Sequence, residues 1–248
     1  MRKTILITGA SSGLGRGMAR EFAAMGRDLA LCARRVDRLE ELKQELEGKH
    51  KNIRVSIKEL DVLNYDQVFE VFQAFKSEFG SIDRIIVNAG SGKGQPVGTG
   101  YFWANRHTAE TNFVAALAQC EASMDIFREQ NSGHLVMISS MSAFRGMPRN
   151  LTTYAATKAG VATLTEGIRS EMIGKPIKVS TIYPGYIRSE INEKIKKAPF
   201  IIDTETGCRL LAKAIEKESN EACVPRWPWV LMGVLMRNMP LKLVNRMS

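Results

Sequence analysis

The sequence predicts an α/β fold in which a parallel sheet carries helices on both faces. Short apolar runs typical of buried strands alternate along the chain with longer segments whose apolar residues recur at helical spacing. A glycine-rich turn directly follows the first apolar run, as at a junction between a strand and a helix. The chain has 248 residues, 44% of them hydrophobic. It is therefore long enough for one α/β domain with a sizeable core.

The composition excludes several classes of protein. Nowhere do eighteen apolar residues follow one another, so we expect no transmembrane helix. The apolar run after Lys3 is too short for the core of a signal peptide. The three histidines share no ligand spacing, and the four cysteines (Cys32, Cys120, Cys208, Cys223) are scattered without a C-x-x-C pair. We therefore expect reduced thiols in a cytoplasmic protein and no metal site.

The net charge of +9 is compatible with several partners. A chain with this charge could bind nucleic acid or an anionic membrane. It could equally bind an anionic cofactor and present a solvated basic surface. We find no basic stripe interleaved with aromatic residues and no signature of a nucleic-acid module. We therefore expect no nucleic-acid partner.

The first unit predicts a strand over residues 3–8, a glycine-rich turn, and a helix over 13–25. Gly9, Gly13 and Gly15 follow the spacing G-x-x-x-G-x-G. Glycine lets the backbone turn sharply and lets a pyrophosphate approach amide N–H groups, and the helix N-terminus favours that anion. An ordinary strand–helix turn can also be rich in glycine, but the place of this one favours dinucleotide binding.

The second predicted strand, residues 28–35, ends in two arginines. At this position an NAD site needs a carboxylate for the ribose hydroxyl, whereas an NADP site needs a cation for the 2′-phosphate. No acidic residue stands there, since Asp37 lies inside the next helix. Arg34 and Arg35 suit a phosphate and favour NADP(H), the alternative being a solvated surface pair.

The middle of the chain continues the alternation. The second helix carries an apolar face at Leu39, Leu42 and Leu46. A strand over 53–62 ends at Asp61 and Val62, and a helix over 64–79 follows with Asn64 as its cap. A strand over 82–90 ends at Asn88, Ala89 and Gly90. These small residues leave room for a flat ring or form a plain turn.

In the second half, residues 91–103 are glycine-rich and predict a loop. A long helix over 104–130 carries Asn112, which either faces solvent or bonds a backbone carbonyl and holds a water. A strand over 134–140, a helix over 151–173 and a strand over 177–185, ending at Pro184 and Gly185, come next. A polar loop over 186–206, a helix over 206–217 and a short strand over 221–225 complete the alternation.

Ser140, Tyr154 and Lys158 form the strongest chemical signal. Tyr154 and Lys158 are four residues apart, which on a helix places both side chains on one face. A nearby ammonium favours the phenolate and lowers the pKa of a tyrosine, as general acid–base work requires. Ser140 ends a strand and can hydrogen-bond a reacting oxygen. A tyrosine and a lysine at this spacing could also be a solvated helix face.

Taken together, the motifs TGASSGLG, NAG and PGYIRS and the set Asn112, Ser140, Tyr154 and Lys158 resemble the short-chain dehydrogenase/reductases. The resemblance runs in order from Lys3 to about Pro225. It implies a Rossmann fold, a three-layer, doubly wound sheet of seven parallel strands. It also implies hydride transfer between a nicotinamide and a carbonyl or alcohol carbon.

The resemblance implies a role for each matching residue. Tyr154 would be the general acid–base, and Lys158 would lower its pKa and bind the nicotinamide ribose. Ser140 would polarise the carbonyl, and Asn112 would serve a proton relay. The remaining cofactor contacts would come from the first turn and from the strand ends, namely Gly9, Ser11, Ser12, Gly13, Leu14, Gly15, Asp61, Val62, Asn88, Ala89, Gly90, Pro184, Gly185, Ile187 and Ser189. The loop over 190–206 would close over the substrate.

One departure from the family pattern concerns the interval before the tyrosine. Ser140 stands fourteen residues before Tyr154, one more than is usual in the family. The extra residue falls between Pro148 and Tyr154, where a loop can absorb it. Ser139 and Ser142 are alternatives to Ser140, which we prefer because it is the second serine of the pair that ends the strand.

We expect a single domain over residues 1–225 with a C-terminal extension, 226–248, belonging to the same domain. The extension has Trp227, Trp229 and a short apolar run, flanked by cations. It either packs on the core or on a neighbouring subunit, or forms an amphipathic segment that contacts a membrane surface. The resemblance also suggests a homodimer or homotetramer.

The expected activity is NADPH-dependent reduction of a hydrophobic ketone or aldehyde. Two alternatives remain, namely the same chemistry run oxidatively as an NADP-dependent alcohol dehydrogenase, and an NADP-sensing binding protein without catalysis.

Overall fold

The computed structural model describes residues 2–92, 94–190 and 199–246. Its strands are β1 (Thr4–Thr8), β2 (Asp28–Ala33), β3 (Val55–Glu59), β4 (Arg84–Val87), β5 (Gly133–Ile138), β6 (Ile177–Pro184) and β7 (Glu221–Val224). They form one parallel sheet in the order β3-β2-β1-β4-β5-β6-β7, which confirms the predicted doubly wound fold. The strand order reverses between β1 and β4, where such sheets open a crevice at their carboxyl edge.

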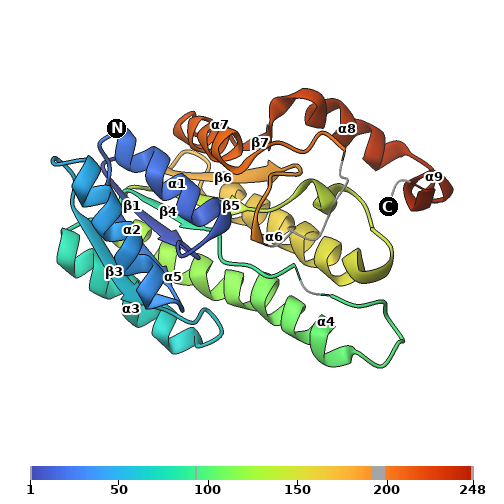
Figure 1. Ribbon diagram of the computed structural model, residues 1–248, viewed down its shortest axis with the longest axis horizontal. Helices are drawn as coiled ribbons and strands as arrows, with labels where there is room; N and C mark the ends of the chain where they lie inside the picture. The colour runs from blue at the N-terminus through green and yellow to red at the C-terminus, as the bar shows by residue number, and fades with distance from the viewer. Residues whose placement is uncertain (1, 93, 191–198, 247–248) are drawn as a thin grey trace.

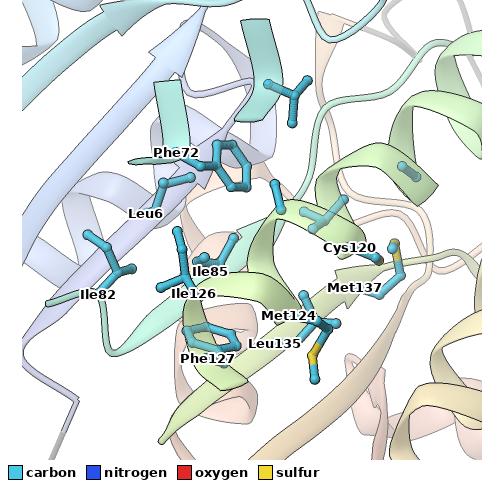
Figure 2. Packing of buried hydrophobic residues seen from close by; sticks show 14 of the residues in the cluster. Leu6, Phe72, Ile82, Ile85, Cys120, Met124, Ile126, Phe127, Leu135 and Met137 are labelled. Atoms are coloured by element: carbon cyan, nitrogen blue, oxygen red, sulfur yellow. The ribbon is translucent and has the colours of Figure 1, made fainter. Parts of the chain in front are cut away.

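Helices cover both faces of the sheet (Figure 1). One layer contains α1 (Gly13–Ala24), α2 (Val36–Lys49) and α7 (Thr204–Glu216), and the other contains α3 (Tyr65–Phe79), α5 (Ala115–Gln130) and α6 (Thr152–Glu171). Side chains alternate along β1, so Ile5 and Ile7 pack with the first layer while Leu6 packs with the second. Figure 2 shows Leu6 in this second core with Phe72 and Phe127.

The strands end earlier than predicted at their carboxyl ends. The strand expected over 28–35 ends at Ala33, and the one over 53–62 ends at Glu59. Backbone pairing stops at these points, so Arg34, Asp61 and Asn88 lie in the loops that follow the sheet. These loops line the crevice, which places the predicted binding residues there.

The long helix predicted over 104–130 is interrupted. It consists of α4 (Phe102–Ala109), a π-helical segment (Glu110–Val114) and α5. A π-helical turn accommodates one more residue than an α-helical turn and often occurs at functional sites. Asn112 lies at the centre of this segment.

The C-terminal extension forms two further helices, α8 (Arg226–Asn238) and α9 (Leu241–Arg246), which lie at the margin of the molecule (Figure 1). Trp227 has extended backbone angles (φ −102°, ψ 133°), so the regular part of α8 starts after it. None of the helices in the described ranges has the length and apolar character needed to cross a bilayer.

Candidate active site

A cavity of about 710 Å³ opens at the carboxyl edge of the sheet. Its size falls within the range of small-molecule sites. Nearly all the residues predicted to bind a cofactor or substrate line it, namely Gly9, Ser11, Ser12, Gly13, Leu14, Arg34, Arg35, Asp61, Val62, Asn88, Ala89, Gly90, Ser140, Tyr154, Lys158, Pro184, Gly185, Ile187 and Ser189. Gly15 and Asn112 do not line it.

The glycine-rich turn brings three backbone segments together. Gly9 has a φ of +65°, and a Cβ on it would lie 3.0 Å from the Cα atom of Ala89. A Cβ on Gly15 would lie 2.3 Å from the carbonyl oxygen of Gly9. Gly15 therefore serves the packing of α1 against the turn. The result is a backbone cradle at the N-terminus of α1, which fits the pyrophosphate of a dinucleotide.

Thr8 joins the end of β1 to the end of β4. Its hydroxyl oxygen accepts hydrogen bonds from the backbone N–H groups of Asn88 (3.0 Å) and Ala89 (3.1 Å). The side-chain amide of Asn88 in turn donates to the Thr8 carbonyl at 2.9 Å. These bonds fix the small residues after β4 in the wall of the cavity.

Arginine side chains surround the end of β2. Arg35 donates to the hydroxyls of Ser12 (2.6 Å) and Ser11 (3.3 Å), while Arg34 is exposed at the rim. Glu190 pairs with Arg35 at 3.2 Å and with Arg38 at 2.7 Å. Burial raises the pKa of Glu190, but hydrogen bonds from Arg38 and Arg35 outweigh it and hold this pKa below its ordinary value. No sequence motif marks Arg38 or Glu190 as part of this site.

At the other end of the cavity, α6 carries Tyr154 and Lys158 one turn apart. The Ser140 side chain lies against the Tyr154 phenol, close enough for a hydrogen bond from it to lower the pKa of the phenol. The Lys158 ammonium donates to the Ile138 carbonyl at 2.9 Å and lies 5.9 Å from the centre of the Tyr154 ring. Lys158 is buried, so the alternative interpretation of a solvated helix face is wrong for this residue.

The neighbouring serines have other partners. Ser139 is 3% exposed, and its hydroxyl donates to the carbonyl of Lys158 at 2.8 Å. Ser142 donates to the hydroxyl oxygen of Ser140 at 3.0 Å. The structure therefore brings Ser140, rather than either alternative, against the phenol.

The extra residue before Tyr154 is taken up in a short 3-10 turn, Arg149–Leu151, which precedes α6. Arg149 adopts a left-handed backbone with a φ of +62°. This compact turn lets α6 begin in position, so the longer interval does not separate Ser140 from Tyr154.

The acid–base properties differ from the sequence expectation. Burial raises the pKa of Tyr154, its hydrogen bond with Ser140 lowers it, and nearby Tyr186 raises it further. In the protein alone the pKa of Tyr154 therefore lies above its ordinary value, because burial outweighs the hydrogen bond with Ser140. Burial also lowers the pKa of Lys158 to about 8.

Asn112 is 2% exposed, so the solvent-facing alternative is wrong. Its side-chain oxygen accepts from the Ser91 N–H at 2.7 Å, and its side-chain amide donates to the Ser91 carbonyl at 2.7 Å. A Cβ on Gly90 would lie 3.2 Å from the Asn112 oxygen and 3.7 Å from the Lys158 ammonium. Asn112 thus positions the loop after β4 beside Lys158, and its part in a proton relay stays a prediction.

Other cavity residues escaped the sequence analysis. Ser91, His107 and Thr111 line the cavity although no motif marks them. His107 and Thr111 are four residues apart and so share one helix face, but neither stands at helical spacing from Asn112, and no sequence signal marks them. Of the loop predicted to close over the substrate, residues 191–198 lie outside the described ranges.

Residues 3–199 match the family model of the short chain dehydrogenases. The chain belongs to this family. An uncharacterised oxidoreductase of Mycobacterium tuberculosis is 51% identical over 247 residues, covering 100% of this chain and 98% of the relative. This short-chain dehydrogenase/reductase is accordingly an NAD(P)-dependent oxidoreductase, and its glycine cradle fits the cofactor.

Solved structures agree on the fold. A short-chain dehydrogenase/reductase from Mycobacterium marinum is 26% identical, with a TM-score of 0.80 over 89% of this chain and 92% of that one. One from Burkholderia phymatum, in complex with NAD, is 21% identical, with a TM-score of 0.84 over 100% of this chain and 96% of that one. The latter likeness includes the C-terminal extension.

Proposed function

We propose that this protein reduces a hydrophobic ketone or aldehyde to an alcohol with NADPH. The observation that carries the proposal is that Ser140 and Tyr154 adjoin at one end of a cavity whose other end is lined by Arg34 and Arg35. Strands β2 and β5, which lead to these two ends, are separated in the sheet by β1 and β4. An extended dinucleotide would fit between these two ends.

The side chains suit reduction. A bound nicotinamide cofactor supplies the hydride. The raised pKa of Tyr154 keeps its phenol protonated at neutral pH, so Tyr154 can give its proton to the carbonyl oxygen as Ser140 donates a hydrogen bond to it. Lys158 is charged below about pH 8, and its ammonium favours the phenolate that remains.

A raised tyrosine pKa also bears on the direction of the reaction. An alcohol dehydrogenase needs Tyr154 as a base, and burial opposes ionisation of the phenol. At neutral pH the phenol is therefore protonated before the reaction, which is the form that reduction starts from. An NADP-sensing protein without catalysis would have no use for the Ser140–Tyr154 pair.

The hydrophobic substrate is inferred from aromatic residues near Tyr154. Tyr186 is close enough to influence its pKa, and the rings of Tyr186 and Phe200 contact Trp229 edge-on at 5.8 Å and 6.0 Å. These three aromatic residues lie behind the cavity rather than in its lining, and an aromatic cluster so close to Tyr154 favours an apolar group next to the reacting carbonyl.

Tyr154→Phe tests the mechanism. We expect NADPH binding, followed by cofactor fluorescence, to persist while turnover of ketones and aldehydes of rising chain length falls about 10²- to 10⁴-fold. Tyr183→Phe is the matched control, because it removes a phenol that bonds Glu221 away from the cavity. Wild-type turnover by Tyr154→Phe would refute the assigned mechanism.

The preference for NADPH needs a separate experiment. Arg34→Asp should reduce kcat/KM with NADPH far more than with NADH, because a carboxylate repels the 2′-phosphate and accepts from a ribose hydroxyl. If the preference for NADPH over NADH were unchanged in steady-state kinetics, Arg34 would not bind the 2′-phosphate.

A further inference from the structure

The inner side of α8 is part of the wall behind the active site. Trp229 is 4% exposed, and its ring occupies the space that a Cβ on Gly185 would need. A Cβ on Gly233 would lie 2.8 Å from the Phe144 ring, which follows the Ser140 segment. Arg145 ties the end of the helix to the same segment by donating to the carbonyls of Arg237 (3.4 Å) and Met239 (3.2 Å). Helix α8 is therefore fixed in place.

The outer side of α8 is apolar and exposed. Its exposed residues recur at helical spacing and are Trp227, Val230, Leu231, Val234 and Leu235, joined by Leu241 and Leu243 of α9. We call these residues the C-terminal apolar face. Trp227 is 75% exposed, and its extended backbone places it ahead of the first regular turn. Helices with such a face and a boundary tryptophan lie in the interface of lipid membranes.

The charges within the C-terminal extension have one sign. From residue 226 to residue 246 the sequence contains Arg226, Arg237, Lys242 and Arg246 and no acidic residue. Arg226, Arg237 and Lys242 are exposed. A second copy of the chain laid on this face about a two-fold axis would bring cations against cations. An anionic surface complements both the cations and the apolar residues.

We propose that the C-terminal apolar face docks this protein on lipid surfaces that carry anionic headgroups. Trp227 and the leucines enter the boundary between headgroups and acyl chains, while Arg226 and Lys242 contact the headgroups. Because the inner side of the same helix backs the active site, the substrate is a carbonyl compound held in the lipid. This last step rests on the proposed reductase activity, whereas the docking does not.

Sedimentation with vesicles tests the docking without any measurement of turnover. We expect the full-length protein to pellet with vesicles containing phosphatidylglycerol and to stay in solution with pure phosphatidylcholine. Raising the ionic strength should weaken the binding, because headgroup contacts are screened. A protein that stays in the supernatant with both kinds of vesicle would overturn the proposal.

Paired variants make the test specific. Trp227→Ser/Leu231→Ser removes apolar surface that makes no core contact, and we expect at least a tenfold loss of vesicle binding. Phe102→Ser/Trp103→Ser is the matched control, because these residues are 75% and 67% exposed on α4. Equal losses in both variants would overturn the proposal. So would a wild-type oligomer that dissociates on Trp227→Ser/Leu231→Ser without vesicle binding, since the face would then join two copies.

Discussion

Buried cations at the amino edge and at the carboxyl edge of the sheet have different kinds of partner. At the amino edge, Arg84 is 1% exposed and is enclosed by partners, since it pairs with Glu216 and Glu218 and donates to the His134 ring at 2.9 Å. At the carboxyl edge, Lys158 is nearly as buried. Its ammonium donates to the Ile138 carbonyl, which is a neutral partner.

The pKa values reflect this difference. Burial lowers the pKa of Arg84, but its carboxylate partners oppose the shift, so the charge persists. Burial lowers the pKa of Lys158 to about 8. Removing one partner from a buried ion pair leaves the other charge uncompensated and destabilises the fold, whereas a buried cation without a counter-ion keeps its charge available to a ligand.

The strongest test of this difference between the two edges is a substitution of Lys158. We expect Lys158→Met to lower turnover about 10²- to 10³-fold, because the phenolate of Tyr154 loses its cation. The free energy of unfolding should stay the same or rise, since a buried charge is removed. Lys175→Met, which removes an exposed ammonium just after α6, is the control. If Lys158→Met lost stability but kept the specific activity of wild type, Lys158 would serve the fold rather than catalysis.

Arg84→Met should have the opposite effect. Removing one member of a buried ion-pair cluster costs about 3 to 5 kcal/mol, so urea denaturation should show a corresponding loss of stability. Turnover per folded molecule should stay at the wild-type level. Arg54→Met disrupts an exposed pair with Glu78 and should change stability little. A stable Arg84→Met protein would show that the amino edge does not hold the fold.

The pH dependence of stability sharpens the contrast. In the unfolded chain Lys158 titrates near 10.5, whereas in the folded protein it titrates near 8. Between these values the unfolded chain binds more protons, so the free energy of unfolding should rise with pH, by no more than about 3 kcal/mol. The measurement is the difference between wild type and Lys158→Met across this range in cofactor-free protein. A difference independent of pH would contradict the lowered pKa.

The smallest effect is expected at Glu190. Its carboxylate pairs with Arg35 and Arg38, two of the arginines that follow β2, and so competes with a phosphate for them. Glu190→Gln should tighten NADPH binding about threefold with little change for NADH, as fits the strength of an exposed ion pair. Glu205→Gln makes the same change of charge on α7 and serves as the control. Equal tightening for both cofactors would point to general charge rather than to competition.

The sequence revealed the parts of the site that depend on local spacing. The glycines after β1 and the pair on α6 could be found because each group lies within one turn or one helix. The bond between Asn112 and Ser91 joins two elements whose approach depends on the fold. Arg84 and Glu216 are 132 residues apart, so their contact could not be found before the order of the strands was known.

The same limit applies to the acid–base chemistry. Four-residue spacing placed Lys158 near Tyr154, but burial is a property of the packed molecule. It raises the pKa of the phenol, contrary to the expectation from spacing alone. The helical extension at the C-terminus was open to two interpretations for a similar reason, because its inner contacts are with distant residues such as Gly185.

The contact between Gly185 and Trp229 constrains how this protein can diverge. The indole ring lies where any side chain at position 185 would begin, 2.2 Å from the place of its first carbon. A larger residue at 185 is therefore tolerated only together with a smaller one at 229. In proteins that descend from this chain, residues 185 and 229 should therefore be substituted together or both be kept.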